Sequence, residues 1–339
     1  MRVVTFGEIM LRLSPNGYNR FFQNDQMNAT FGGAEANVAV SLANFGLQSR
    51  YVTKLPENIV GNAAENSLKQ FGVDTSYILR GGERLGIYFY EKGASQRACS
   101  CTYDRAHSSF QTAYKNEFDW DAIFDGADWF HFCGITPALS DEMVEICIEA
   151  CKAAKQKNIK ISMDTNYRQK LWTLEKARPV FAKLCEYVDL LITNPGDAKD
   201  LFGVLSDEPD FELSKPIQKG STSIAKKLKD MFGFEKVALT LRTNKSASEN
   251  DWTAMIYNGC DYNFASEYNL QIVDRVGGGD SFAAGLIYAL LSNKSDKDAI
   301  EFATAASSLK HSVEGDFNRV SVAEVESLAS GKNCGRVQR

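Results

Sequence analysis

Short runs of apolar residues alternate along the chain with longer stretches in which apolar residues recur every three or four positions. The short runs, at residues 3–6, 129–135, 159–163, 188–192 and 236–241, predict buried β-strands. The longer stretches, at residues 34–45, 141–157, 175–187 and 223–232, have the spacing of amphipathic helices. Alternation of this kind is typical of a doubly wound, mostly parallel sheet, so we predict an α/β fold.

Two segments break the alternation. Residues 10–30 are polar and aromatic, and residues 86–111 contain two strand patterns with a turn at residues 92–95 between them. We predict that both segments form a small β lid inserted into an α/β body of residues 1–9, 31–85 and 112–339. The exposed edges of such a lid would be covered if two subunits paired there, so we expect a homodimer or higher homo-oligomer.

Charge and composition exclude several classes of partner. The net charge is −5, from 38 basic and 43 acidic residues, so there is no basic field to bind nucleic acid. No segment approaches the roughly 18 apolar residues of a membrane span, and the N-terminus lacks the pattern of a signal peptide. We therefore expect a cytoplasmic protein with no membrane partner. The eight cysteines and three histidines do not have the spacing of a zinc site.

The segment at residues 274–285 joins three glycines to an aspartate and then to an apolar helical stretch. Gly277, Gly278 and Gly279 can bring backbone N–H groups around an anion at a helix N-terminus. Asp280 would place a carboxylate, a potential base, at the same point. The alternative is that Asp280 only caps the helix after an ordinary glycine turn. These residues alone leave both interpretations open.

Other polar groups are expected at the same edge of the sheet. Polar residues follow four of the predicted strands, at residues 7–8, 164–168, 193–197 and 242–246. In a doubly wound sheet the carboxyl ends of the strands face the ligand crevice, so these groups should converge. Gly32 and Gly33 open the predicted helix at residues 34–45, either for close approach of a substrate or for a turn with positive φ. Asn37 could bond a substrate hydroxyl or be solvated.

Two common nucleotide-binding motifs are missing. The chain has no G-x-x-x-x-G-K-[ST] sequence, which excludes a P-loop. The glycines at residues 277–279 do not form a G-x-G-x-x-G fingerprint, and they lie late in the chain rather than after the first strand. This argues against a nicotinamide-dependent oxidoreductase.

Two signatures together resemble those of the ribokinase-like (PfkB) carbohydrate kinases. Residues 32–37, with Gly46 after the helix, resemble the N-terminal signature, and residues 274–285 resemble the C-terminal signature, which ends in a G-x-G-D anion hole. The resemblance covers essentially the whole chain, including the lid. Within the family, residues 101–105, 164–172 and 311–318 are most similar to 2-keto-3-deoxygluconate kinases.

Three positions depart from the family pattern. Arg275 stands where many members have proline, and residues 240–244 lack the glycines of the usual nucleotide loop. Asp197 replaces the glutamate of the N-x-x-E magnesium motif. The second departure bears on nucleotide preference and the third on metal affinity.

The resemblance implies an ATP-dependent kinase that phosphorylates the terminal C6 hydroxyl of 2-keto-3-deoxygluconate to give 2-keto-3-deoxy-6-phosphogluconate. It implies Asp280 as the base, Gly277, Gly278 and Gly279 as the anion hole, and Mg²⁺ on the ATP phosphates near Asn194 and Asp197. The residues implied to bind the sugar acid are Gly33, Tyr88, Tyr103, Arg105, Arg168 and Asp316, with the two arginines pairing with its carboxylate. The residues implied for the nucleotide are Asn194, Arg242, Ser246, Gly277, Gly279 and Lys310.

Three other functions stay open at the level of sequence. One is a fructokinase or another sugar kinase of the same type. Arg105 and Arg168 argue against the members of this group that act on neutral sugars. Another is a nicotinamide-dependent oxidoreductase, which the missing fingerprint disfavours. The third is a sugar sensor without catalysis, which the presence of Asp280 disfavours.

Overall fold

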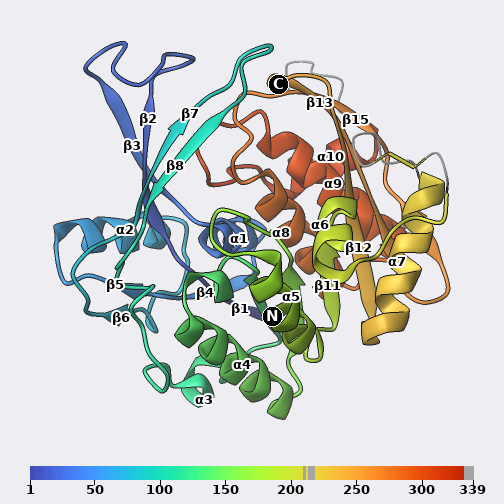
Figure 1. Cartoon of the computed structure of the whole chain (residues 1–339), viewed down its shortest axis with the longest axis horizontal. Helices are drawn as coiled ribbons and strands as arrows, with labels where there is room; N and C mark the ends of the chain where they lie inside the picture. Colours follow the sequence, from blue (N-terminus) through green and yellow to red (C-terminus); the bar gives the residue numbers. More distant parts are fainter. Residues whose placement is uncertain (209–210, 213–217, 332–339) are drawn as a thin grey trace.

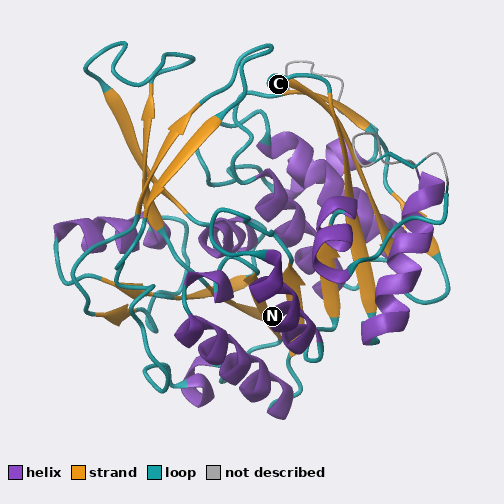
Figure 2. Ribbon diagram, in the orientation of Figure 1, coloured by secondary structure: helices purple, strands orange, loops and turns teal. Residues whose placement is uncertain are grey.

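The computed structural model describes residues 1–208, 211–212 and 218–331, so residues 209–210, 213–217 and 332–339 of the predicted body lie outside the described residues. The described residues form one large mixed sheet, a smaller four-stranded sheet and the helices that pack on them (Figures 1 and 2). The predicted α/β architecture with a mostly parallel sheet is confirmed.

The large sheet has nine strands in the described residues. Its order is β14-β13-β12-β11-β10-β9-β1-β4, with β15 pairing with β13. Pairing is parallel from β4 to β12 and antiparallel from β12 through β13 to β14 and β15. The strands are β1 (Arg2–Phe6), β4 (Gln48–Val52), β9 (Trp129–Cys133), β10 (Lys160–Asp164), β11 (Leu190–Thr193), β12 (Lys236–Asn244), β13 (Glu249–Tyr257), β14 (Tyr262–Phe264) and β15 (Tyr268–Gln271).

Helices cover both faces of this sheet. Alternate residues of one strand enter different cores: in β11, Leu191 packs in one cluster, and Leu190 and Ile192 pack in the other. One core is closed by α3 (Trp120–Ile123), α4 (Asp141–Gln156), α5 (Leu174–Cys185), α6 (Pro195–Phe202) and α7 (Gln218–Phe232). The other is closed by α1 (Ala34–Asn44), α8 (Gly278–Leu291), α9 (Asp296–Lys310) and α10 (Val322–Ala329). Apolar runs on both faces are what a buried parallel sheet requires.

Capping residues fix where several helices begin and end. The Ser140 side chain accepts a hydrogen bond from the Met143 N–H at the start of α4, and Asn194 does the same for Asp197 at the start of α6. Gly46 follows α1 with φ of +86°, as the sequence indicates for a helix-terminating glycine. Helix α7 begins at Gln218, five residues before the predicted start at residue 223.

Strands from both aromatic segments form the smaller sheet. It contains β2 (Met10–Pro15), β3 (Met27–Gly32), β7 (Ile87–Glu91) and β8 (Ser100–Asp104), in the order β3-β2-β7-β8. The β2 and β7 strands pair in parallel, and the two outer pairs are antiparallel. Figure 1 shows this sheet rising at the upper left, apart from the large sheet. The division of the chain into a body and a lid stays a prediction.

The remaining elements lie near the small sheet. Strands β5 (Lys54–Leu55) and β6 (Leu79–Arg80) pair in parallel, and helix α2 (Ile59–Lys69) lies between them in the chain. In the part of the chain that the structure describes, no helix is long and apolar enough to span a membrane.

Candidate active site

A cavity of about 610 Å³ lies at the carboxyl ends of the parallel strands, with walls from both sheets. Most of the predicted site residues line it: Gly33, Tyr88, Tyr103, Arg105, Arg168, Asn194, Asp197, Arg242, Gly277, Gly279, Asp280 and Asp316. The convergence expected from the polar strand ends is therefore observed. Gly278, Ser246 and Lys310 do not line this cavity.

Residues 277–279, called the glycine turn below, lead directly into α8 and include its first two residues. Gly277 is the residue before the helix and has the left-handed φ of +84°, whereas Asp280 lies within the first helical turn. No side chain caps this helix, so the interpretation of Asp280 as the N-cap residue is wrong. Its carboxylate instead lies at the positive end of the helix dipole, on the cavity wall.

Asn37 orients the Asp280 carboxylate. The Asn37 Nδ2 donates a 2.6 Å hydrogen bond to Asp280 Oδ2, and Asn37 itself is buried. Burial raises the pKa of Asp280 to about 7, with Glu35 and Asp316 adding to the rise and the Asn37 bond opposing it. Asn37 is thus buried rather than solvated, but it also lines the cavity, so a bond from Asn37 to a substrate hydroxyl stays a prediction. A carboxyl group with a pKa near neutrality suits proton transfer at physiological pH.

Two further carboxyl groups lie close to Asp280. Burial raises the pKa of Asp164 to about 8, and the charges of Asp280 and Asp197 add to the effect. Burial also raises the pKa of Asp197. The charges of Asp280 and Asp197 both disfavour ionisation of Asp164, so a cation beside these acids would be stabilised. Among the described residues, no group of three or more His, Cys, Asp or Glu side chains is arranged to hold a metal by itself.

Asn194 and Asp197 already have structural partners. The Asn194 Oδ1 accepts the Asp197 N–H at 3.0 Å as the helix cap of α6. The Asp197 Oδ2 accepts hydrogen bonds from Thr165 Oγ1 and the Tyr167 N–H. Mg²⁺ commonly takes one or two carboxylates together with substrate phosphates and water, so this donor set fits an ion brought in by a nucleotide better than a resident ion.

Gly32 and Gly33 allow close packing, and neither has a left-handed φ (that of Gly33 is extended, at 176°), so the turn interpretation is wrong. A Cβ on Gly32 would lie 2.0 Å from Asp316 Oδ2, and a Cβ on Gly33 would lie 2.0 Å from the backbone oxygen of Glu8. The glycine pair therefore lets the start of α1 approach the residues that follow β1 and α9.

Aromatic residues of the small sheet form one wall of the cavity. Tyr88 and Tyr103 are directly opposed on β7 and β8, and their rings stack with centroids 5.9 Å apart. The Tyr88 hydroxyl donates to Asp316 Oδ2, and Asp316 Oδ1 accepts from Arg12. Asp316 is therefore held by protein groups, although a carboxylate with about four lone-pair sites can accept a further hydroxyl.

The two predicted arginines lie in different surroundings. Arg105 Nε donates to Glu8 Oε2 at 2.8 Å, and this ion pair is buried. Two of its five N–H donors are used there, which leaves others for a ligand. Arg168 is exposed, lines the cavity and makes no side-chain hydrogen bond or ion pair within the described parts of the chain. It is the better placed of the two to capture an anion.

Two further arginines, Arg242 and Arg275, line the cavity near Arg168. Burial lowers the pKa of Arg242, and the nearby charges of Arg275 and Arg168 lower it further. Arg275 occupies the position where related kinases often have proline, and it also lines the cavity. Three guanidinium groups that repel one another favour a bound anion such as a phosphate chain.

Ser246 and Lys310 do not line the cavity, and each has a protein partner. The Ser246 hydroxyl accepts the Ser248 N–H in the turn between β12 and β13. Lys310 is fully buried, and its Nζ donates to the Val313 carbonyl at 3.1 Å. Burial lowers the pKa of Lys310, against the opposing effect of Asp274 and Asp316. Both residues shape loops next to the cavity, and their assignment to the nucleotide stays a prediction.

Sequence reasoning missed the roles of Arg12 and Glu35, and it predicted Glu8 only as a polar residue after the first strand, without its partner. Arg12 and Glu8 each form buried ion pairs, and Glu35 accepts hydrogen bonds from the Cys133 N–H and Thr136 Oγ1. The signal available in the sequence was weak: each is a charged residue within an otherwise apolar stretch. Because buried charges require partners, a charged residue in an apolar stretch indicates a buried ion pair or hydrogen bond, even when the partner is distant in sequence.

The α/β body, the glycine turn and the acid beside it define a class of sugar-phosphorylating enzyme, and the chain belongs to the pfkB family of carbohydrate kinases, whose model matches residues 1–321. The fold is closely similar to a crystal structure of 2-dehydro-3-deoxygluconokinase from Thermotoga maritima. That protein is 48% identical, with a TM-score of 0.94 over 98% of this chain and 100% of that chain.

Two curated relatives are similar over nearly their whole length. The 2-dehydro-3-deoxygalactonokinase of Haloferax volcanii is 29% identical, over 98% of this chain and 98% of its own. The 2-dehydro-3-deoxygluconokinase of Bacillus subtilis is 28% identical, over 93% of this chain and 91% of its own. The predicted family membership is confirmed.

Proposed function

We propose that this chain is an ATP-dependent 2-keto-3-deoxygluconate (2-dehydro-3-deoxygluconate) kinase, which phosphorylates the C6 hydroxyl of the sugar acid. The observation that carries the proposal is the position of Asp280. It lies at the N-terminus of α8, directly after the glycine turn, in a cavity that is also lined by Arg168, whose side chain has no ion-pair partner among the described residues. The names of the relatives from T. maritima and B. subtilis support the same substrate.

In the proposed reaction, Asp280 accepts the proton of the C6 hydroxyl as the phosphoryl group is transferred. Asn37 holds the carboxylate, and the pKa of about 7 keeps it basic enough to act near neutral pH. Backbone N–H groups of Gly277, Gly278 and Gly279 stabilise the charge on the transferred oxygens. Phosphoryl transfer through a loose transition state depends on positioning and charge stabilisation of this kind.

The acid group of the sugar is bound by arginine. Arg168 provides a guanidinium that pairs with no other described residue, and Arg105 contributes the donors that Glu8 does not use. Tyr88, Tyr103 and Asp316 face the sugar ring or its hydroxyls, and Gly33 lets the sugar approach the backbone.

The nucleotide binds in the same cavity. Arg242 and Asn194 contact its phosphates, and Mg²⁺ is carried with them near Asn194 and Asp197. Mg²⁺, when bound, neutralises charge on the phosphates. The raised pKa values of Asp164 and Asp197 support a cation at this place.

Assembly is proposed from the edges of the small sheet, and location from the sequence. The small sheet has β3 and β8 at its edges, and a second subunit could cover them in a homodimer. A cytoplasmic location is the expectation for this chain, and it is a proposal rather than a property of the fold.

A coupled assay of ATP consumption tests the proposal. The panel contains 2-keto-3-deoxygluconate, its C4 epimer 2-keto-3-deoxygalactonate, fructose and ribose. The epimer is included because the H. volcanii relative is named for it. We expect one of the acids to be preferred over both neutral sugars, with the gluconate form first. Higher kcat/KM for fructose or ribose would contradict the proposal, and NAD(H) binding without ATP turnover would favour an oxidoreductase.

A further inference from the structure

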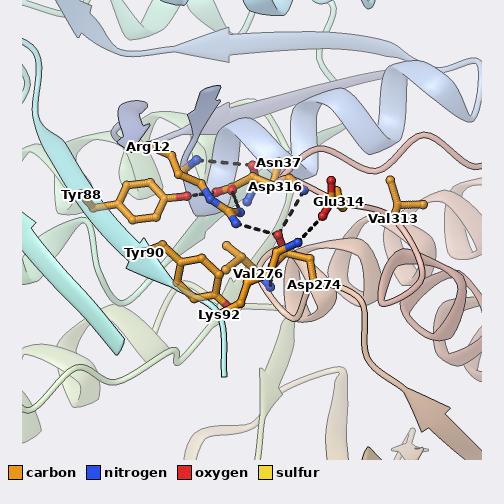
Figure 3. A network of polar contacts seen from close by, with 12 residues as sticks. Arg12, Asn37, Tyr88, Tyr90, Lys92, Asp274, Val276, Val313, Glu314 and Asp316 are labelled. Carbon is orange, nitrogen blue, oxygen red and sulfur yellow. Dashed lines mark hydrogen bonds and ion pairs between the residues drawn. The ribbon is translucent and has the colours of Figure 1, made fainter. Parts of the chain in front are cut away.

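Arg12 crosses from the small sheet into the body of the protein. It lies on β2, opposite Tyr88 of β7, and only 2% of its surface is exposed. Its Nη1 donates to Asp316 Oδ1 and its Nη2 donates to Asp274 Oδ2, both at 2.7 Å. The guanidinium also lies 4.4 Å from the centre of the Tyr90 ring. Figure 3 shows this side chain pointing from the small sheet toward the two carboxylates.

Both carboxylates belong to segments that border the glycine turn. Asp274 Oδ1 accepts the Val276 N–H, and its Oδ2 accepts the Gly315 N–H, each at 3.2 Å. Asp274 thus ties the residue just before Gly277 to the loop after α9. The Asp316 backbone oxygen lies 2.2 Å from where a Cβ of Gly277 would be. One guanidinium therefore holds the two segments between which Gly277 has its left-handed conformation.

The charges in this network depend on Arg12. Burial lowers the pKa of its guanidinium, but the charges of Asp316 and Asp274 outweigh that effect, so Arg12 stays charged. Burial raises the pKa of Asp316 and the charge of Asp274 adds to the rise, while Arg12 lowers it. Without the guanidinium, the buried carboxyl groups of Asp274 and Asp316 would lose both hydrogen bonds from Arg12, with Lys310 left as a nearby positive group. The loops that carry them would then move apart, or one carboxyl group would take up a proton.

A second connection runs through Tyr88. Its hydroxyl donates to Asp316, and its ring stacks on Tyr103 on the cavity wall. The same carboxylate therefore contacts the wall proposed to face the sugar and, through Arg12, the segment that sets the glycine turn. A ligand that moves Tyr88 would change the hydrogen bonds of Asp316 and so the support of Gly277.

We propose that Arg12 is a positioning residue for phosphoryl transfer: by bridging Asp274 and Asp316 it holds the backbone of Gly277, Gly278 and Gly279 in the conformation that receives the transferred group. The proposal rests on the kinase function proposed above. Arg12 does not line the cavity, so it acts through the turn and through Tyr88. Its loss should impair the transferring step more than the binding of either substrate.

The test compares Arg12→Lys with a matched control, Arg50→Lys. Arg50 is also buried, pairs with Asp74 at 2.9 Å and donates to the Ile123 carbonyl, but it does not line the cavity. We expect Arg12→Lys to lower kcat at least tenfold, with KM for the sugar acid and the Kd for ATP changed less than threefold. Arg50→Lys should lower the unfolding temperature to a similar extent and leave kcat unchanged.

Asp274→Asn provides a second route to the same interaction if Arg12→Lys does not fold. Asparagine keeps an oxygen acceptor for the Val276 N–H and removes the charge paired with Arg12. We expect kcat to fall, and the double variant Arg12→Lys/Asp274→Asn to be little worse than either single one, because both remove the same interaction. Unchanged kcat with lowered stability, or losses in log kcat that simply add, would overturn the proposal. Failure of the wild-type protein to phosphorylate any sugar acid would instead refute the kinase function itself.

Discussion

At the scale of single residues, the raised pKa of Asp280 lowers the stability of the folded protein near neutral pH and suits the proposed role of Asp280 as a base. Its pKa in the folded protein is about 7, far above its ordinary value of 3.8, because the carboxyl group is buried. Between about pH 4 and pH 7 the folded form keeps a proton that the unfolded form has lost, so stability falls as the pH rises through this window. Active sites often accept such costs for the reactivity they give.

The variant Asp280→Asn separates these two effects. We expect kcat to fall by about 10²–10⁴, the usual contribution of a general base, while ATP binding is retained. At pH 8 the unfolding temperature should rise by a few degrees because the buried charge is gone, and the gain should shrink toward pH 4. Calorimetry and steady-state kinetics on the same preparation measure both. Near-wild-type kcat would refute the assignment of Asp280 as the base.

The pH dependence of the wild-type enzyme follows from the same pKa. Asp280 must lose its proton to act as a base, so activity is lost as the pH falls through about 7. We expect log kcat/KM for the sugar acid, measured at low fixed ATP, to fall with a slope near 1 below that pH. The residual activity of Asp280→Asn is the control and should lack this limb. A profile that is flat from pH 5 to pH 8 would contradict a base with this pKa.

At the scale of elements, the glycine turn before α8 contains two glycines needed for different reasons. Gly277 has φ of +84°, and a Cβ there would overlap the Asp316 backbone. Gly279 is inside the helix, lines the cavity and has no atom within 4 Å of where a Cβ would be. The backbone conformation explains the first glycine, and space for a ligand explains the second.

Alanine at each position should therefore change stability in opposite directions. Gly277→Ala should destabilise the protein by about 1–3 kcal/mol or more, since the left-handed conformation and the close contact both oppose a side chain. Gly279→Ala should be neutral or stabilise the helix by up to about 1 kcal/mol, yet lower kcat because its methyl group enters the cavity. Denaturant unfolding and kinetics measure the pair. Full activity in Gly279→Ala would show that the transferred group lies elsewhere.

The sequence predicted elements well where one periodicity dominates. The parallel strands β9 to β11 and the helices α1, α4 and α5 were found because their apolar residues recur at strand or helix spacing. The parallel pairing of β2 with β7 was not foreseen, because those strands are far apart in the chain and their pattern does not specify a partner. The antiparallel β13 and the edge strands β14 and β15 were missed as well.

The candidate site was predicted through motifs rather than through contacts. The glycine signatures led to Gly33, Gly277 and Asp280, which line one cavity. The pairing of Arg105 with Glu8, and of Arg12 with Asp274, brings together residues about 100 and 260 positions apart, and nothing local in the sequence indicates such partners. Long-range ion pairs are properties of the folded chain, so they need the structure.

At the scale of the whole molecule, the proposed selectivity for a sugar acid depends on the small sheet and on the α/β part, which line the same cavity. The small sheet and the residue after β8 supply Tyr88, Tyr103 and Arg105, and the loop after β10 and helix α8 supply Arg168 and Asp280. The β7–β8 turn also contacts the β12–β13 turn, where the Ala247 N–H donates to the Ser95 carbonyl at 2.8 Å. The cavity walls are therefore linked across both parts, and a sugar acid would contact both at once.

The central claim is that a cationic group in this cavity selects an acidic sugar whose hydroxyl reaches Asp280. The most direct measurement is the ratio of kcat/KM for 2-keto-3-deoxygluconate to that for fructose, in the wild type and in Arg168→Gln. A lost charge-assisted hydrogen bond of about 1.5–3 kcal/mol should lower the ratio by roughly tenfold to a hundredfold, through the acid rather than through fructose. A wild-type ratio below one, or a ratio unchanged in Arg168→Gln, would contradict the claim.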